Sequence, residues 1–360
     1  MLLVVTVVFC IAWGAAGHQK ISYNIFLFMN SEMSQFSDWP NILAYHSSDA
    51  DDRKKTDPSE SPNHYIDIDN YYEFVSTGKI PQTIDSAESA HNYYFVHNNG
   101  ILPWATKASF DSLKACFLRY DWSHAEFFAA DLGHYVADGH MPLHITKDYN
   151  GRPPNGIHSR YESKMIKDHL DEIVYTGGSV SVIPDVSQYI FNYIYTNHNY
   201  VDTILAADDS AQSISSNTSS SQYNNALWQQ TKGLTIRLFR NASHALTELI
   251  YTAWVQAGSP LISETSVTSE KPVQNVSLEQ NFPNPFGKKT QIRYTLTCDS
   301  EICIRVEDVT GRRVKTIVNG FVEKGFHTLE WHPVIELPGN YFLIIQSGKY
   351  RQVRKMLYIP

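Results

Sequence analysis

Residues 134–144 read HYVADGHMPLH and combine a helical pattern with side chains that bind metals. His134 and Asp138 are four residues apart, so on a helix both side chains point from one face toward a single ion. The helix is expected to stop at Pro142, because a proline disfavours the helical conformation in the residue before it. His144 follows this stop. The segment therefore predicts a helix that ends in a metal site.

The same spacing recurs in NGIHSRYE at residues 155–162, where His158 and Glu162 are again four residues apart. The loop at residues 150–156 would allow the two helices to converge. Either pair alone is more often a hydrogen-bonded surface or core pair than a metal site. Five nitrogen and oxygen ligands in one short region favour a metal centre over that interpretation.

Apolar residues recur at helical spacing on both sides of this region, which indicates a mainly helical domain over residues 13–258. Two such stripes consist of Ala125, Ala129, Leu132 and Val136, and of Leu234, Leu238, Ala242, Ala245, Leu249 and Ala253. The loops between the helices, rich in Asp, Asn, Ser and Pro, occupy residues 49–63, 150–155 and 208–221. Such loops suit ligand binding and lids better than core packing.

A change of composition at residues 259–277 separates this domain from a second one. The segment contains no aromatic residue and is dominated by Ser, Thr, Val and Pro, as in an interdomain linker. Beyond it, short alternating runs punctuated by glycines occupy residues 291–296, 302–306, 327–331 and 341–346. This pattern predicts a small all-β sandwich over residues 278–360, so the expected fold class is mainly α with an added antiparallel β domain.

The composition limits the classes to which the protein can belong. Its 360 residues, 42% of them hydrophobic, exclude a disordered chain and a small disulfide-stapled scaffold. A net charge of −8, from 29 Lys and Arg against 37 Asp and Glu, argues against stable binding of duplex nucleic acid, although a nuclease with a local site remains compatible. Cys298 and Cys303 flank a turn-like sequence and could pair, whereas Cys116 lies among apolar residues and is expected to be buried.

Residues 1–12, MLLVVTVVFCIA, form the one membrane-like stretch of the sequence. The stretch is too short for a spanning helix, which needs about 20 residues. We therefore expect a secretory signal peptide, with Cys10 and Ala12 as the small residues at the cleavage site. Cleavage there would leave Trp13 as the N-terminus.

Five segments occur in the order found in one protein family. They are WGAAGH at residues 13–18, AD at 50–51, HYID at 64–67, HYVADGHMPLH at 134–144 and NGIHSRYE at 155–162. Together they resemble the zinc-dependent phospholipase C and single-strand-specific nuclease superfamily, over about 150 residues. The resemblance implies a multihelical phospholipase C/nuclease-like catalytic domain with a trinuclear zinc site.

The resemblance also implies which residues hold the three zinc ions. One ion would be bound by Asp51, His64, His134 and Asp138, and a second by His144, His158 and Glu162. The third would be bound by His18, the bridging carboxylate of Asp138, and the α-amino and carbonyl groups of Trp13. Because an acylated Trp13 nitrogen has no lone pair to offer zinc, removal of the signal peptide would be linked to zinc loading.

The implied reaction is hydrolysis of a phosphoric diester by a zinc-activated water. A water between two of the ions would be the nucleophile, and Asp51 would orient or deprotonate it as the catalytic residue. No covalent intermediate on serine or cysteine is needed. The remaining histidines without a matching family position are expected to be structural or solvated; they include His46, His91, His97, His140, His198 and His244.

The residues leave two substrate classes open. Glu162 as the last ligand resembles the phospholipase branch, since nucleases of this family usually carry aspartate there, and a phospholipase C-like enzyme is our first prediction. Asp52 and Ser61 stand where the phospholipase surrounds choline with aromatic residues, so a cation-π wall would be missing. Tyr65 lies where the family has an aromatic that stacks on a base or lines a lipid pocket. A single-strand-specific nuclease or 3′-nucleotidase is therefore the alternative, and an inactive surface binding module is a more distant one.

Two further tyrosines, Tyr71 and Tyr72, follow this aromatic position. All three could equally be core residues.

The C-terminal region carries a second resemblance. LEQNFPNPF at residues 278–286, followed by IRYTL, VEDVTGRRV, GFHTLEWH and PGNYFLII, resembles the C-terminal sorting domain of type IX secretion substrates. It implies Sec export to the periplasm, translocation by the type IX machinery, and a secreted or cell-surface protein. The alternative is a carbohydrate-binding or spacer sandwich. The expected partners are thus this machinery and a phospholipid or single-stranded nucleic acid substrate.

Overall fold

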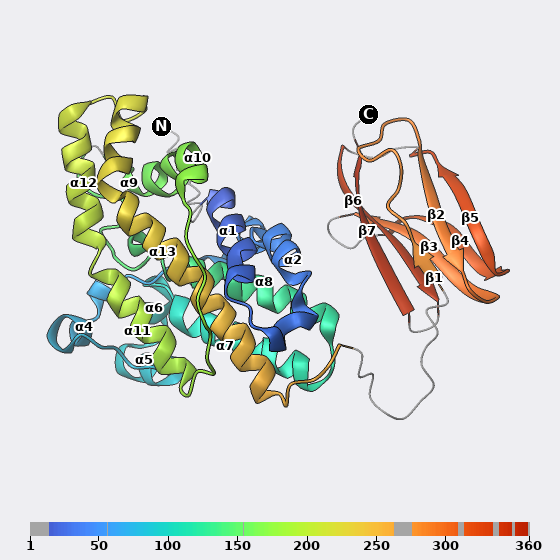
Figure 1. Cartoon of the computed structure of the whole chain (residues 1–360), viewed down its shortest axis with the longest axis horizontal. Helices are drawn as coiled ribbons and strands as arrows, with labels where there is room; N and C mark the ends of the chain where they lie inside the picture. Colours follow the sequence, from blue (N-terminus) through green and yellow to red (C-terminus); the bar gives the residue numbers. More distant parts are fainter. Residues whose placement is uncertain are drawn as a thin grey trace. The chain divides into compact units, whose positions relative to one another are not determined.

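A computed structural model describes residues 14–55, 57–153, 155–262, 276–308, 313–333, 338–347 and 350–358. The chain divides into a helical unit, Met1–Thr265, and a unit of β-strands, Ser266–Pro360 (Figure 1). This division falls within residues 259–277, the segment with the composition of a linker. The expected signal peptide at residues 1–12 and Trp13 lie outside the described residues.

The helical unit is built from α-helices of very different length. They are α1 (Gly14–Tyr23), α2 (Trp39–His46), α3 (Asp49–Arg53), α4 (Tyr72–Thr77), α5 (Ile84–His91), α6 (Tyr93–Asn98), α7 (Leu102–Leu118), α8 (Trp122–Asp138), α9 (Ile157–Ser159), α10 (Ile166–His169), α11 (Val186–His198), α12 (Val201–Ile214) and α13 (Ser221–Gln256). Short segments that carry predicted ligands are the 3₁₀ turns η3 (Pro58–His64) and η5 (Pro142–His144) and the π-helical η6 (Arg160–Met165). Within the described ranges, none of the helices has both the length and the apolar character needed to cross a bilayer.

Side-chain caps explain where the two central helices begin. Asp121 precedes α8, and its carboxylate accepts a hydrogen bond from the backbone N–H of His124 at 3.4 Å. Ser220 precedes α13, and its Oγ accepts from the backbone N–H of Tyr223 at 3.1 Å. α8 ends at Asp138, so the predicted metal-binding pair lies in its last turns.

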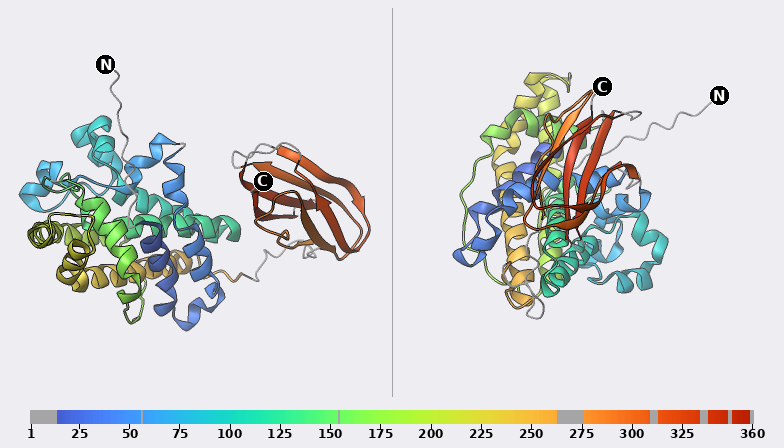
Figure 2. Two further views of the ribbon diagram at one scale, coloured as in Figure 1. Left: turned by 90° about the horizontal axis from the view of Figure 1, so that it is seen from above. Right: turned by 90° about the vertical axis from the view of Figure 1, so that its right-hand side faces the viewer.

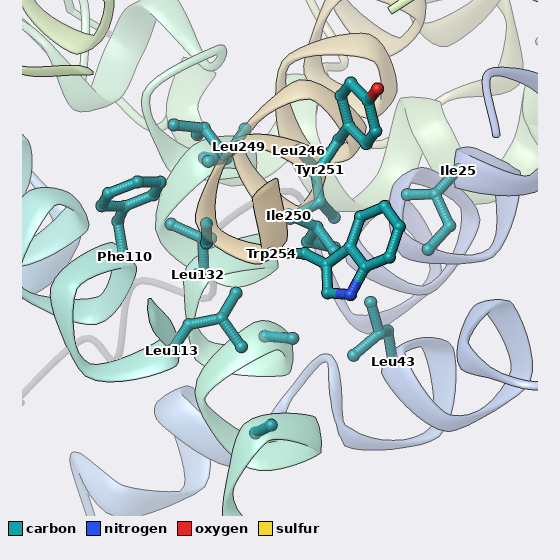
Figure 3. Packing of buried hydrophobic residues seen from close by; sticks show 14 of the residues in the cluster. Ile25, Leu43, Phe110, Leu113, Leu132, Leu246, Leu249, Ile250, Tyr251 and Trp254 are labelled. Carbon is teal, nitrogen blue, oxygen red and sulfur yellow. The ribbon is translucent and has the colours of Figure 1, made fainter. Parts of the chain in front are cut away.

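One core cluster of the helical unit lies where α13 packs against α7 and α8 (Figures 1 and 2). Figure 3 shows Leu132 of α8 and Phe110 of α7 beside Leu246 and Leu249 of α13. The helices approach closely at Gly133, where a Cβ atom would lie 3.0 Å from Cδ2 of Leu246. All ten residues of the two predicted apolar stripes are buried. The helical interpretation of both stripes is therefore confirmed.

Replacing Leu246 with alanine tests this packing. The Leu246 side chain is 0% exposed, so its removal leaves a cavity and should lower the free energy of unfolding by about 2–5 kcal/mol. Leu118→Ala is the matched control, because Leu118 is 56% exposed and its truncation should change that free energy by less than about 0.5 kcal/mol. Urea unfolding followed by circular dichroism measures both variants. Equal effects would contradict the assigned core.

The second unit is an antiparallel sandwich of two sheets. Its strands are β1 (Val276–Leu278), β2 (Thr290–Leu296), β3 (Ser300–Asp308), β4 (Arg313–Val322), β5 (Gly325–Trp331), β6 (Gly339–Ser347) and β7 (Tyr350–Tyr358). One sheet has the order β1-β2-β5 and the other β4-β3-β6-β7. In β2, Ile292, Tyr294 and Leu296 are buried while the residues between them are partly exposed. The predicted fold class, a multihelical domain followed by an all-β sandwich, is confirmed.

The suggested pairing of Cys298 with Cys303 is wrong, because both thiols are free. Cys303 lies within β3, opposite Asn319 and Gln346 of the neighbouring strands, and Cys298 precedes that strand. An extended chain rises about 3.3 Å per residue, and a disulfide requires Cα atoms within about 7 Å of each other. The extended strand therefore carries Cys303 too far from Cys298 for the two to pair. Cys116 is fully buried, as predicted.

Candidate metal centre

Segments far apart in the sequence bring the predicted ligands together inside the helical unit. α1 contributes His18, α3 Asp51, η3 His64, α8 His134 and Asp138, η5 His144, α9 His158, and η6 Glu162. All eight of these residues belong to groups whose ligand atoms could hold a metal ion. The ninth predicted ligand, Trp13, lies outside the described residues.

Asp138 lies at the junction of these groups and is 0% exposed. Its Oδ1 is 3.4 Å from Nε2 of His18 and 3.5 Å from Nδ1 of His144. Its Oδ2 is 3.1 Å from Nδ1 of His64 and 3.4 Å from Nε2 of His134. Oδ1 thus faces His18 and Oδ2 faces His64 and His134, which is a geometry suited to a carboxylate shared between ions, whereas Nδ1 of His144 donates to the carbonyl oxygen of His64.

Asp51 closes one side of this arrangement. Its Oδ1 lies 3.7 Å from Nδ1 of His64 and 3.7 Å from Nε2 of His134. Two overlapping groups result, in which ligand atoms lie within 4.8 Å of one another: His64 with His134 and Asp138, and His18 with Asp51 and His134. The rings of His18 and His134 stack with centroids 3.9 Å apart. His134 belongs to both groups, so the division of ligands between the first and third ions stays a prediction.

The third group consists of His144, His158 and Glu162, all of them buried. Oε2 of Glu162 lies 3.3 Å from Nε2 of His144 and 2.9 Å from Nε2 of His158. Glu162 is part of the π-helical segment η6, and π-helical turns occur often at functional sites. The chain enters the preceding helix α9 through Gly156, whose φ of 117° suits glycine.

Backbone carbonyl groups fix the orientation of two ligand rings. His134 donates from Nδ1 to the carbonyl oxygen of Ser47 at 2.7 Å. His144 donates from Nδ1 to the carbonyl oxygen of His64, also at 2.7 Å. With the proton held on Nδ1, the lone pair of Nε2 faces the cluster, as in most metal-binding histidines.

The acidic side chains of the cluster are ionised. Burial alone would raise the pKa of Asp138, but the imidazoles of His134 and His144 hold it well below its usual range. Burial opposes ionisation of Glu162 as well, and His158 and His144 lower its pKa. The surrounding imidazoles therefore offset the cost of burying these carboxylates.

Several buried atoms of the cluster make no hydrogen bond. They include both ring nitrogens of His18, Oδ2 of Asp51 and Oδ1 of Asp138. A buried polar atom without a partner costs about 1–3 kcal/mol, and most such atoms in native proteins are satisfied. Imidazole nitrogens and carboxylate oxygens are ligands that zinc accepts. The residues present therefore fit zinc.

Three neighbours of the cluster were not predicted from the sequence: Lys54, Glu60 and Tyr135. Lys54 Nζ lies 2.5 Å from Oδ1 of Asp51, and Oε1 of Glu60 lies 3.3 Å from Nε2 of His64. The i, i+3 and i, i+4 spacings of these two pairs were the available signals. No such spacing marks Tyr135, because its partners Glu60 and Arg53 lie on other segments.

The three tyrosines considered from the sequence have different positions. Tyr71 is 0% exposed and belongs to the core, whereas Tyr72 is 69% exposed. Tyr65 is partly exposed, and its hydroxyl donates to the carbonyl oxygen of Asn98 at 3.3 Å. Burial, with smaller contributions from Asp67 and Tyr149, raises the pKa of Tyr65.

The other histidines considered from the sequence are not members of the metal-binding groups. Their ring partners are Asp49 for His46, Glu73 for His91, Glu88 for His97, the Val136 carbonyl for His140, the Phe74 ring for His198 and the Ser179 carbonyl for His244. Their side chains thus have local structural partners.

No family model matches the chain, and no curated protein matches it in sequence. Among solved structures, an alpha-toxin from Clostridium absonum is similar at 11% identity and a TM-score of 0.41, covering 94% of this chain and 93% of that one. An alpha-toxin from an avian strain of Clostridium perfringens has 12% identity and a TM-score of 0.41, covering 94% and 87%. Similarity at this level does not assign an activity, which has to be argued from the residues themselves.

The three ligand groups predict how many zinc ions the chain binds and that a single substitution removes one of them. The mature chain should contain about three zinc ions, and Glu162→Ala should lose about one of them because it removes the oxygen between His144 and His158. His91→Ala is the control, since His91 pairs with Glu73 at 2.7 Å outside the cluster. Native mass spectrometry combined with elemental analysis measures the content. One ion or none in the unmodified chain would contradict the assignment.

Proposed function

We propose that the chain is a zinc-dependent phosphodiesterase, a hydrolase in which a metal-activated water attacks a phosphate ester. The observation that carries the proposal is the shared position of Asp138, whose Oδ1 faces His18 and whose Oδ2 faces His64 and His134 within 3.1–3.4 Å. Ligand groups that meet at one carboxylate would hold ions close enough to act on one phosphate. An inactive binding module is disfavoured, since all eight described ligand positions keep competent side chains.

The residues around the centre suggest how they would act. Bound zinc ions would supply an acidified water and stabilise negative charge on phosphate. Asp51 would orient that water and accept its proton at Oδ2, the carboxylate oxygen that is not paired with Lys54. Burial would raise the pKa of Asp51, but His134, His18 and Lys54 lower it, so the carboxylate is ionised and able to accept.

A phospholipase C-like substrate is the first candidate, since Glu162 is the last ligand, as in the phospholipase branch that the sequence resembles. The surroundings disfavour choline as the head group. Asp52 is exposed and pairs with Lys55 at 2.6 Å, and Ser61 is exposed. Neither position offers an aromatic wall for a quaternary ammonium.

Single-stranded nucleic acid is the second candidate, favoured by the groups beside the metal ligands. Tyr65 directly follows His64, and the ring of Tyr149 lies 5.6 Å from that of His158. Asp67 interacts electrostatically with Tyr65. Burial, together with Asp69 and Asp148, raises the pKa of Asp67 to about 6. Aromatic rings near a hydrogen-bonding carboxyl group suit an unstacked base, for which stacking contributes about 1–3 kcal/mol.

For the second unit we propose the role implied by the sequence resemblance, a sorting domain for type IX secretion. The helical enzyme would then act outside the cell or at its surface. The sandwich fold is compatible with this role and with a spacer.

Activity on a substrate panel tests the proposed reaction. The zinc-loaded chain should release products from phospholipids, single-stranded DNA or RNA, and the preferred substrate distinguishes the two candidates. Asp51→Asn should lower kcat by about 10²–10⁴-fold while most of the zinc is kept. Asp52→Asn, which changes the exposed neighbour, should act like the unmodified chain. Full activity of Asp51→Asn would remove Asp51 from the reaction.

The predicted role of Trp13 has its own test. A chain with an additional methionine before Trp13 keeps every side-chain ligand but converts the α-amino nitrogen into an amide, which cannot bind zinc. It should contain about one zinc ion fewer and turn over slowly. Proteolytic exposure of Trp13 followed by zinc addition should restore both properties. Equal zinc content and equal rates in the extended and trimmed chains would show that Trp13 is not a ligand.

A further inference from the structure

We propose that Glu60 is a positioning residue that orients His64 toward the metal centre through a carboxylate–imidazole pair. The inference rests on the proposed zinc-dependent function, because His64 is one of the predicted ligands. Glu60 itself would contact neither the substrate nor the ions.

His64 presents different nitrogens to the two sides of its ring. Nδ1 faces the cluster, 3.1 Å from Oδ2 of Asp138 and 3.0 Å from Nε2 of His134. Nε2 is on the opposite side, buried and without an aligned hydrogen bond, and Oε1 of Glu60 is 3.3 Å from it. Since Nδ1 must be unprotonated to bind a metal, the proton belongs on Nε2, and a small turn of the ring aligns that N–H with Glu60.

Glu60 is itself held in place by two donors. The hydroxyl of Tyr135 donates to Oε1 at 2.5 Å, and Nε of Arg53 donates to Oε2 at 3.2 Å. Nη2 of Arg53 lies 3.4 Å from Oε1 of the same carboxylate. A carboxylate paired with a guanidinium is a charged acceptor, and a charged acceptor strengthens the bond to an imidazole N–H.

The partners of Glu60 connect the segments that supply the ligands of one ion. Arg53 follows Asp51 on α3, and its Nη1 donates to Oδ1 of Asp131 on α8 at 3.0 Å. Tyr135 is the neighbour of His134 on the same helix. α3, η3 and α8 each contribute a ligand to the centre and a member to this network. The network therefore fixes the relative positions of three segments from outside the metal site.

Zinc release from Glu60→Gln tests the inference. Glutamine keeps the shape of the side chain and removes its charge, so one class of zinc should be lost to a coloured chelator about 10–100-fold faster, while the other ions leave at the unmodified rate. Glu248→Gln is the matched control. Glu248 is also buried and accepts from Tyr189 at 2.8 Å and from Ser181 Oγ at 3.2 Å, but it has no link to a predicted ligand and should release zinc as the unmodified chain does.

The melting temperature of the chelator-stripped proteins separates positioning from general support of the fold. It should be similar in Glu60→Gln and Glu248→Gln. Unchanged zinc release in Glu60→Gln, or equally faster release from every site together with a lower melting temperature, would overturn the inference. If the unmodified chain binds zinc but hydrolyses no phosphodiester, the proposed reaction fails while the release rates still decide the role of Glu60. An unmodified chain that binds no zinc overturns both.

Discussion

The buried carboxylate of Asp138 is the constraint on which the site depends. An ionised carboxylate taken out of water is strongly destabilising unless positive charge or a metal surrounds it. Here four imidazoles from four different segments lie within 3.5 Å of its oxygens. Each segment that approaches Asp138 therefore brings a further candidate ligand into the interior.

α8 connects this charge to the apolar core. The helix buries small and branched side chains against α7, α2 and α13, with Gly133 allowing close approach to Leu246. Its last turns carry His134 and Asp138. Because a helix packed along its length is rigid, the ligand pair at its end is held in a defined position, as a metal site with several ligands requires.

A second layer of polar contacts surrounds the ligands. Carbonyl groups of Ser47 and His64 orient His134 and His144, and the network of Arg53 and Glu60 lies behind His64. The two carbonyl contacts place the proton of His134 and of His144 on Nδ1. The ligands are thus arranged for metal binding by groups that do not touch the metal, which explains how residues from loops and short 3₁₀ turns can form an ordered site.

The sequence by itself determined the helical stripes and the antiparallel sandwich, and it predicted the two i, i+4 pairs and the other candidate ligands that lie together in the structure. The stripes, the strands and the i, i+4 pairs are local, because helical and strand periodicities act over a few residues. The other candidate ligands follow from the order of motifs that resembles one family. Tertiary structure alone decided the meeting of His18, Asp51 and His134, the free thiols of Cys298 and Cys303, and the contact of Tyr135 with Glu60. Such features depend on distances between segments remote in the chain, or on the extension of a strand. No local pattern encodes which buried charges come to lie beside one another.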